Sequence, residues 1–233
     1  MDFLETYAPL HPKQRLGRAG DGGYVCIDDG HAYDLFLSCG LGDDVSFDAA
    51  FLAAHPDIPA YAVDGTVERP SALPERATFI KKNIAPYESE GTTNLYELLA
   101  AHKNVFLKMD IEGFEWGWFD AMPAELLANI RQIVVEFHGM INSSWQAGPI
   151  RKRRVLAKLA GTHTLVHVHG NNTAGARYYR GCIVPYVVEL TYLRKDAGHA
   201  GRNTQSFPVA GLDFPNDPTA PEISLTGYPF VNI

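Results

Sequence analysis

The stretch VFLKMDIEGFEW, residues 105–116, decides the fold because a buried strand runs directly into carboxylates. Apolar side chains fill most of its first half, which is typical of a strand covered on both faces. Three acids follow: Asp110, Glu112 and Glu115. Ligands of an open α/β sheet bind beyond the carboxyl ends of its strands, so these acids either cap a turn and a helix or form part of a site.

Asp110 and Glu112 are the acids that we assign to a site. Side chains alternate across a strand, so Lys108 and Asp110 share one face, and Asp110 is the expected partner of that buried ammonium. Glu115 stands where a helix would begin, and a helix-start acid needs no functional role. The sequence therefore predicts a crevice that Asp110 and Glu112 face.

Strands alternate with helices along most of the chain. The predicted strands are residues 35–39, 60–65, 77–85, 105–111, 132–138, 163–172 and 183–194. The predicted helices are residues 45–55, 93–102, 115–121, a short helix restarted at Pro123, and 150–161. This alternation predicts an α/β, doubly wound sheet with a parallel core. Residues 173–181 are too few for a helical crossover, so the last two strands should form an antiparallel hairpin.

No linker or internal repeat divides the chain, so we predict a single domain of residues 1–233. Residues 1–30 are rich in turn formers and predict an N-terminal hairpin region. Residues 196–233 contain five prolines and little periodicity, which predicts an irregular C-terminal tail over the surface.

The composition narrows the class of protein, its partners and its location. Hydrophobic residues make up 46% and charged residues 20%, a normal globular balance. The net charge of −7 argues against a nucleic-acid partner, and we interpret RKRR, residues 151–154, as a solvated helix start. Three scattered cysteines, no visible signal peptide and no apolar stretch of ~18 residues predict a cytoplasmic protein without a membrane span.

A glycine turn, Gly40-Leu41-Gly42, separates the first predicted strand from its helix. Glycines let the backbone approach a ligand there, and the helix start offers free N–H groups. A dinucleotide fingerprint would place a third glycine where this chain has Val45. Acids such as Asp43 would repel a phosphate, so the ligand should be neutral or cationic at this end. The alternative is an ordinary tight turn.

Asp64 ends the second predicted strand, 22 residues after Gly42. A carboxylate at that position can accept hydrogen bonds from both hydroxyls of a ribose, in NAD and S-adenosylmethionine sites alike. The alternative is a turn aspartate before Gly65.

Two pairs of titratable side chains, one of them a pair of histidines, lie at the ends of later predicted strands. Glu136 and His138 share a face in one strand, and His167 and His169 share a face in the next. With Asp110, such side chains could form an oxygen and nitrogen metal site or an acid–base set. The predicted hairpin places its second strand between them, so His167 and His169 should lie far from Asp110.

Together these segments resemble the FkbM-type methyltransferases. The resemblance runs from about residue 15 to residue 195. It rests on DGGYV, LSCGLGDDVSFD, AVDGT, LKMDIEGFEW, VVEFH, HVHGNN and ELTYLR. It implies a class I S-adenosylmethionine-dependent methyltransferase with a Rossmann-like, seven-stranded, mostly parallel sheet whose strand seven is antiparallel. Family members are usually O-methyltransferases acting on sugars or polyketide-like products.

The resemblance also implies site residues. Gly40 and Gly42 match the cofactor loop, Asp64 the ribose acid, and Asp110 and Glu112 the acids of strand four. Many class I enzymes have an acid two residues before the first loop glycine, where this chain has Ser38. The methionine amino group would then be bound by Asp21, Asp43 or Asp110.

A sulfonium donor carries positive charge, so carboxylates around it suit the ligand. A hydroxyl acceptor, on a small molecule or a glycan, also needs a base or a metal such as Mg²⁺ or Mn²⁺ to lower its pKa. Asp110, Glu136 and His138 are the candidates for either role. A nicotinamide-dependent oxidoreductase and a non-catalytic binding module are the competing hypotheses.

Overall fold

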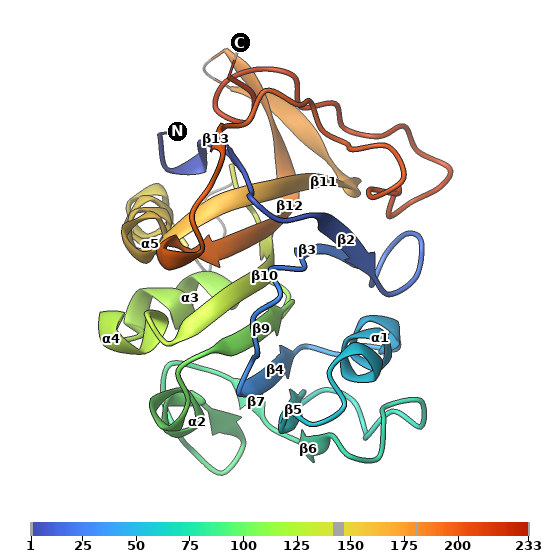
Figure 1. The fold of residues 1–233 in the computed structure, drawn as a ribbon, viewed down its shortest axis with the longest axis vertical. Helices are drawn as coiled ribbons and strands as arrows, with labels where there is room; N and C mark the ends of the chain where they lie inside the picture. Colours follow the sequence, from blue (N-terminus) through green and yellow to red (C-terminus); the bar gives the residue numbers. More distant parts are fainter. Residues whose placement is uncertain (1, 142–146, 180, 233) are drawn as a thin grey trace.

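The computed structural model describes residues 2–141, 147–179 and 181–232. A seven-stranded sheet forms its centre, in the order β11-β12-β10-β9-β4-β5-β6 (Figure 1). Its strands are β4 (Leu35–Cys39), β5 (Ala60–Val63), β6 (Thr78–Ile80), β9 (Val105–Met109), β10 (Ile130–His138), β11 (His163–Tyr179) and β12 (Cys182–Arg194). Strands β4, β5, β6, β9 and β10 are parallel.

The antiparallel hairpin is confirmed. Strand β12 pairs antiparallel with both β10 and β11, and it lies between them. The predicted α/β, Rossmann-like, doubly wound, seven-stranded sheet with strand seven antiparallel is therefore correct. The hairpin is longer than predicted, because β11 continues to Tyr179 and projects from the sheet (Figure 1). The predicted third strand is divided into β6 and a separate β7 (Asn83–Ile84), which pairs with β8 (Thr92–Thr93).

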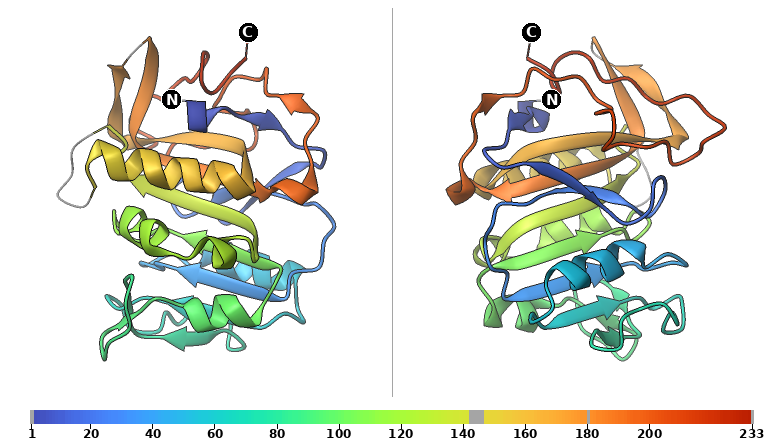
Figure 2. Two further views of the ribbon diagram at one scale, coloured as in Figure 1. Left: turned by 90° about the vertical axis from the view of Figure 1, so that its left-hand side faces the viewer. Right: turned by 45° about the vertical axis from the view of Figure 1, so that its right-hand side comes forward.

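Helices cover both faces of the sheet (Figure 2). Helix α1 (Ser46–Ala54) and the hairpin of β2 (Lys13–Leu16) and β3 (Tyr24–Ile27) cover one face. The other face carries α2 (Tyr96–Ala101), α3 (Glu115–Ala121), α4 (Ala124–Leu127) and α5 (Pro149–Thr162). No helix in the described ranges is long and apolar enough to cross a membrane.

Alternation along the central strands divides the core in two. On β4, Leu35 and Leu37 pack toward α2 to α5, whereas Phe36 packs toward α1. The Phe36 ring stacks on Phe51 of α1 at 4.3 Å between centroids, and Phe51 lies equally close to Phe106 of β9. Both faces of β4 and β9 are therefore buried, as their apolar sequences predict.

The two terminal segments add short elements outside the seven-stranded sheet. A short 3-10 helix, η1 (Asp2–Leu4), precedes β1 (Tyr7–Ala8), which pairs with β13 (Gly201–Arg202) from the tail. After η2 (Lys195–Ala197) the tail is mostly irregular in its described part, and it buries Phe207, Leu225 and Phe230 in the core. The tail is thus packed against the sheet through side chains rather than through regular structure.

Candidate active site

A cavity of about 890 Å³ lies at the carboxyl ends of β4, β5 and β9. All seven residues that the sequence assigned to a cofactor line it: Asp21, Gly40, Gly42, Asp43, Asp64, Asp110 and Glu112. The carboxyl ends of parallel strands meet at one edge of a sheet, which is why residues so far apart in sequence come together.

Gly40 allows the loop after β4 to approach the loop after β9 closely. Its φ is +76°, and a Cβ at this position would lie 1.6 Å from the carbonyl oxygen of Asp110. The Asp110 amide donates to the Cys39 carbonyl at 2.8 Å, which ties the end of β9 to the end of β4. Any side chain at Gly40 would push apart the two loops that line the cavity.

Asp64 holds the glycine turn in this structure. One carboxylate oxygen accepts the Leu41 and Gly42 amides at 2.9 and 3.3 Å. The other accepts the amide and hydroxyl of Thr66 at 2.7 and 2.6 Å. Burial raises the pKa of Asp64, but these hydrogen bonds outweigh it and hold the pKa below its ordinary value. All four donors therefore act on the ionised form.

The predicted pairing of Lys108 with Asp110 is wrong. The buried Lys108 ammonium donates to the Gly40 carbonyl and lies 5.6 Å from the centroid of the Tyr24 ring. Within the described part of the chain, no ion pair joins Lys108 to Asp110. Strand alternation gave the shared face correctly, but the neighbouring loop from β4 supplied a nearer acceptor.

Tyr24 is a site residue that the sequence reasoning missed. Its hydroxyl lies 2.9 Å from Asp110 Oδ2 and 3.3 Å from Glu136 Oε2, so its single proton can serve either carboxylate. Burial, followed by the charges of Asp110 and Glu136, raises the pKa of Tyr24 well above its ordinary value. The signal was present, because Tyr24 is the aromatic residue of the DGGYV segment that contributed to the resemblance.

Glu136 lies behind Tyr24 rather than in the cavity lining. Its Oε1 accepts the Asn171 side-chain amide at 2.7 Å. Burial, then the charges of Asp110 and Glu189, raises the pKa of Glu136 well above its ordinary value. A catalytic role for Glu136 would therefore act through Tyr24, and this predicted role stays a prediction.

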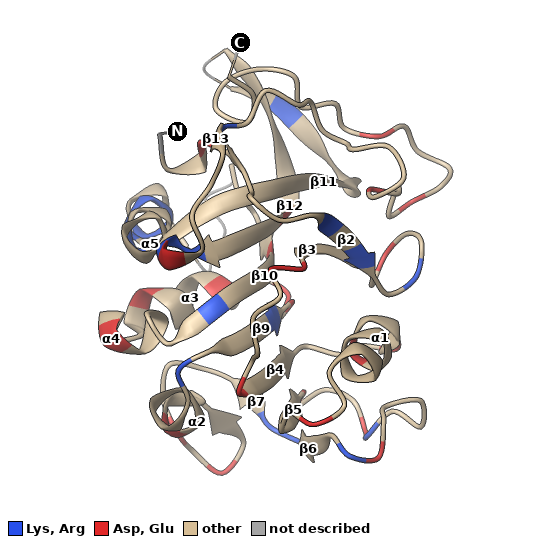
Figure 3. Ribbon diagram, viewed as in Figure 1, with Lys and Arg blue, Asp and Glu red and all other residues tan. Residues whose placement is uncertain are grey.

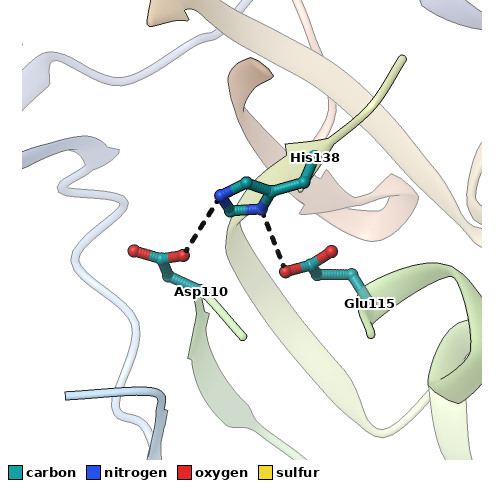
Figure 4. Close-up of side chains that lie close together, drawn as sticks. All are labelled: Asp110, Glu115 and His138. Carbon is teal, nitrogen blue, oxygen red and sulfur yellow. Dashed lines mark hydrogen bonds and ion pairs between the residues drawn. The ribbon is translucent and has the colours of Figure 1, made fainter. Parts of the chain in front are cut away.

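His138 lies between carboxylates at the end of β10 (Figure 4). Its Nδ1 is 3.3 Å from Glu115 Oε1, and its Nε2 is 3.3 Å from Glu112 Oε2 and 4.0 Å from Asp110 Oδ1. Burial alone would lower the pKa of His138. The hydrogen bond and charge of Glu115, with the charges of Glu136 and Asp110, overcome this and raise it to about 9.

Glu115 is more than the helix-start acid that the sequence predicted. It does begin α3, but its side chain has no exposed surface. Its Oε1 accepts the Ile111 and Gly113 amides at 2.9 and 3.0 Å, besides facing His138. The sequence offered no sign of this role, because the pairing of β9 with β10 brings the end of β10 beside the start of α3 only in the folded structure.

The groups that could hold a metal differ from the predicted set of Asp110, Glu136 and His138. Ligand atoms of Asp110, Glu115 and His138 lie within 4.8 Å of one another, and Glu136 is outside this group. The two imidazole nitrogens face different carboxylates (Figure 4). An ion on Nε2 would have Asp110 and Glu112 on its side, with Glu115 on the opposite nitrogen. Metal binding stays a prediction.

The histidines of β11, His167 and His169, are not among the residues that line the cavity. His167 bonds Asp213 at 2.8 Å, and His169 lies 3.0 Å from Glu189 and 3.3 Å from Glu222. The Asn172 side chain also donates to tail carbonyls. The segment HVHGNN therefore anchors the C-terminal tail.

The basic run at the start of α5 is engaged with its neighbours. Arg151 and Arg154 pair with Asp120, and Lys152 donates to the Gly139 carbonyl. Basic residues are scattered among acidic ones over the molecule (Figure 3). The absence of a nucleic-acid partner stays a prediction, and this arrangement agrees with it.

The fold and cavity define a Rossmann-like α/β protein with a large cavity at the carboxyl ends of its parallel strands. A sequence profile of the methyltransferase FkbM domain matches residues 24–170. The chain belongs to this family. No curated protein matches the sequence.

The solved structures that match this chain share little of its sequence. A chain of the fibrillarin/Nop5p complex is 14% identical, with a TM-score of 0.41, and the match covers 71% of this chain and 77% of that one. The plantazolicin methyltransferase BpumL, in complex with a monoazolic desmethylPZN analog and SAH, is 9% identical, with a TM-score of 0.33 and coverages of 71% and 77%. Human N-acetylserotonin methyltransferase in complex with SAM is 10% identical, with a TM-score of 0.32 and coverages of 70% and 48%.

Proposed function

We propose that this protein transfers a methyl group from S-adenosylmethionine to a hydroxyl oxygen of a neutral small molecule or glycan. One observation carries the proposal: in a chain of the FkbM methyltransferase family, every residue assigned to the cofactor lines a single cavity. Its volume of about 890 Å³ is near the upper end for ligand sites, which suits a cofactor and an acceptor side by side.

The charge of the cavity favours a sulfonium cofactor. Six carboxylates line it: Asp21, Asp43, Asp44, Asp64, Asp110 and Glu112. Its three cations are engaged with protein groups, Arg18 with Asp44 at 2.8 Å and Lys82 and Lys108 with backbone carbonyls. A pyrophosphate would meet uncompensated negative charge here, whereas a sulfonium and an ammonium would be attracted.

In this proposal, Asp64 must give up some of its present hydrogen bonds when it binds the cofactor. A carboxylate has about four acceptor positions, and four protein donors already use them. To bind ribose hydroxyls, Asp64 must exchange some of these partners. We propose that the glycine turn moves when the cofactor binds, and that Asp21, Asp43 or Asp110 receives the amino group.

The reaction is an in-line displacement. The acceptor oxygen attacks the methyl carbon, the carbon–sulfur bond breaks, S-adenosylhomocysteine leaves, and the hydroxyl proton passes to a base. We assign the base to Asp110, because it lines the cavity and faces both Tyr24 and His138. His138 lies 4.0 Å from Asp110, and Glu136 acts on it through the Tyr24 hydroxyl; neither His138 nor Glu136 is part of the lining. Mg²⁺ or Mn²⁺ on Nε2 of His138 is the alternative way to activate the hydroxyl.

The same negative lining selects the acceptor. A phosphate or carboxylate on the acceptor would be repelled, so neutral hydroxyl compounds, including sugars, are the proposed class. We also propose a cytoplasmic location, because Cys26, Cys39 and Cys182 are all free and buried, as suits a reducing compartment.

Calorimetry tests the cofactor first. We expect S-adenosylhomocysteine to bind and NAD not to bind, because only the former lacks a pyrophosphate. Transfer of labelled methyl groups to matched neutral and phosphorylated sugars then tests the acceptor. Binding of NAD in preference to S-adenosylhomocysteine would overturn the cofactor assignment, and preference for the phosphorylated sugar would overturn the acceptor class.

A further inference from the structure

We propose that Glu115 is a positioning residue that fixes both the His138 imidazole and the loop after β9. Its catalytic consequence rests on the proposed methyl transfer, whereas its effect on His138 does not. Nothing in the sequence separates Glu115 from an ordinary helix-start acid. The structure does, because one buried oxygen of this side chain joins two strand ends.

Three contacts converge on Glu115 Oε1. The amides of Ile111 and Gly113 donate to it at 2.9 and 3.0 Å, and His138 Nδ1 lies 3.3 Å away. The first two donors belong to the loop after β9, and the third ends β10. Figure 4 shows the imidazole lying between Glu115 on one nitrogen and Asp110 on the other. A single oxygen therefore sets the relative placement of Asp110 and His138.

The loop that Glu115 holds is conformationally demanding. Glu112 has a φ of +56°, in the left-handed region that side chains other than glycine rarely adopt, and Gly113 follows at +97°. Hydrogen bonds on either side of Glu112, from Ile111 and Gly113, stabilise this conformation. The loop carries Glu112 into the cavity lining, directly after Asp110.

His138 is anchored to the start of α3 twice. The indole nitrogen of Trp116, the residue after Glu115, donates to the His138 carbonyl at 2.7 Å. Glu115 then takes the Nδ1 side of the ring, which leaves Nε2 for Glu112 and Asp110. Backbone and side chain of His138 are both fixed, so Nε2 is directed at the acids of the cavity.

A helix-start role alone does not explain Glu115. Such an acid is normally solvated, as Glu97 is in the first turn of α2. Glu115 is completely buried, and its Oε2 has no hydrogen-bond partner among the described residues. Burying a carboxylate costs free energy, and the contacts of Glu115 with the loop and with His138 offset that cost.

The variant E115Q separates the two roles, and E97Q is the matched control. The glutamine oxygen can still accept the two loop amides, but the charge that attracts Nδ1–H is lost. In protein labelled with ¹⁵N-histidine, we expect a downfield Nδ1–H proton of His138 in wild type and in E97Q. It should be absent in H138Q, which assigns it, and shifted upfield in E115Q.

Turnover gives the second readout. E115Q should lower kcat by roughly 10-fold or more while S-adenosylhomocysteine affinity changes less than about twofold. In an H138Q background, E115Q should lower kcat little further, because the two residues act as one unit. E97Q should leave both quantities unchanged.

Each result decides the proposal. An Nδ1–H signal that is missing in wild type, or unchanged in folded E115Q, would overturn the positioning role, and the wild-type measurement stands even if E115Q fails to fold. Additive effects of E115Q and H138Q on kcat would show that Glu115 acts elsewhere. A wild type that binds S-adenosylhomocysteine but methylates nothing would refute the proposed function, and the proton signal would still decide the positioning role.

Discussion

Two histidines on strands of the same sheet, His138 on β10 and His169 on β11, both lie between carboxylates but differ in access. His138 and His169 each lie between carboxylates, and these carboxylates raise each pKa to about 9. The His138 side chain is 22% exposed, and its Nε2 faces acids that line the cavity. His169 is 2% exposed and faces Glu222 of the tail.

The comparison shows that a raised imidazole pKa does not identify a functional site by itself. The same shift serves as a structural clamp at His169, where an imidazolium holds the tail against β12 through Glu189 and Glu222. At His138 the carboxylates on the open side belong to a cavity large enough for ligands. Access, rather than the charge state, separates the two sites.

The largest expected effect contrasts the outer carboxylates of the two histidines. Asp110→Asn keeps the shape and removes the charge, so methyl transfer should fall by roughly 10²-fold or more. Glu222→Gln makes the matching change beside His169 and should leave the rate within about twofold of wild type. The rate with saturating cofactor is the measurement. Full activity in folded Asp110→Asn would end the proposed role of Asp110.

The second prediction tests whether the cofactor binds in the cavity beside His138. Asp64→Ala should weaken S-adenosylhomocysteine binding by about 1–3 kcal/mol, because it removes charged hydrogen bonds to the ribose and the glycine turn. Asp57→Ala, at an exposed aspartate outside the cavity lining, is the control. Calorimetry measures both. Equal affinities in the two folded variants would remove Asp64 from the site.

The third prediction concerns stability and pH at His169. Because its pKa is about 9 when folded against 6.5 ordinarily, its charged form stabilises the fold. This contribution, on the order of 1–3 kcal/mol, is complete below pH 6.5 and lost as the pH rises through about 9. His169→Gln should therefore lower the free energy of unfolding mainly at the acid end of that range.

Denaturant unfolding of wild type and His169→Gln across this pH range checks the sign. The difference between the two proteins should shrink as the pH rises. A difference that is constant with pH would mean that His169 stabilises the tail through packing rather than through charge.

The smallest expected effect is that of metal removal. Each nitrogen of His138 already faces a carboxylate, so we expect a side chain rather than a metal ion to take the proton from the acceptor hydroxyl. EDTA should therefore change the rate by less than about twofold. Loss of activity with EDTA, restored by Mg²⁺ or Mn²⁺, would favour the metal alternative at Nε2. The His169 side chain is only 2% exposed, so we expect no metal beside it. The rate of Glu222→Gln should therefore respond to EDTA as the rate of wild type does.

The sequence by itself determined the fold and the edge of the sheet at which the candidate site lies. Apolar runs and their alternation with helices specified the sheet, and the short connection between the last strands specified their antiparallel pairing. Gly40, Asp64 and Asp110, which the sequence assigned to a cofactor site, do line one cavity, because the doubly wound topology brings the ends of parallel strands to the same edge. Their roles there stay predictions.

Only the tertiary structure decided the partners of these residues. Lys108 bonds the Gly40 carbonyl instead of Asp110, Tyr24 from the covering hairpin bridges Asp110 and Glu136, and Glu115 reaches His138. A one-dimensional pattern gives the face and the end of a strand on which a residue lies. It does not give distances to side chains from other elements. Hydrogen bonds and charge interactions depend on separations of a few ångströms, and these are fixed only when the strands, the hairpin and the loops pack together.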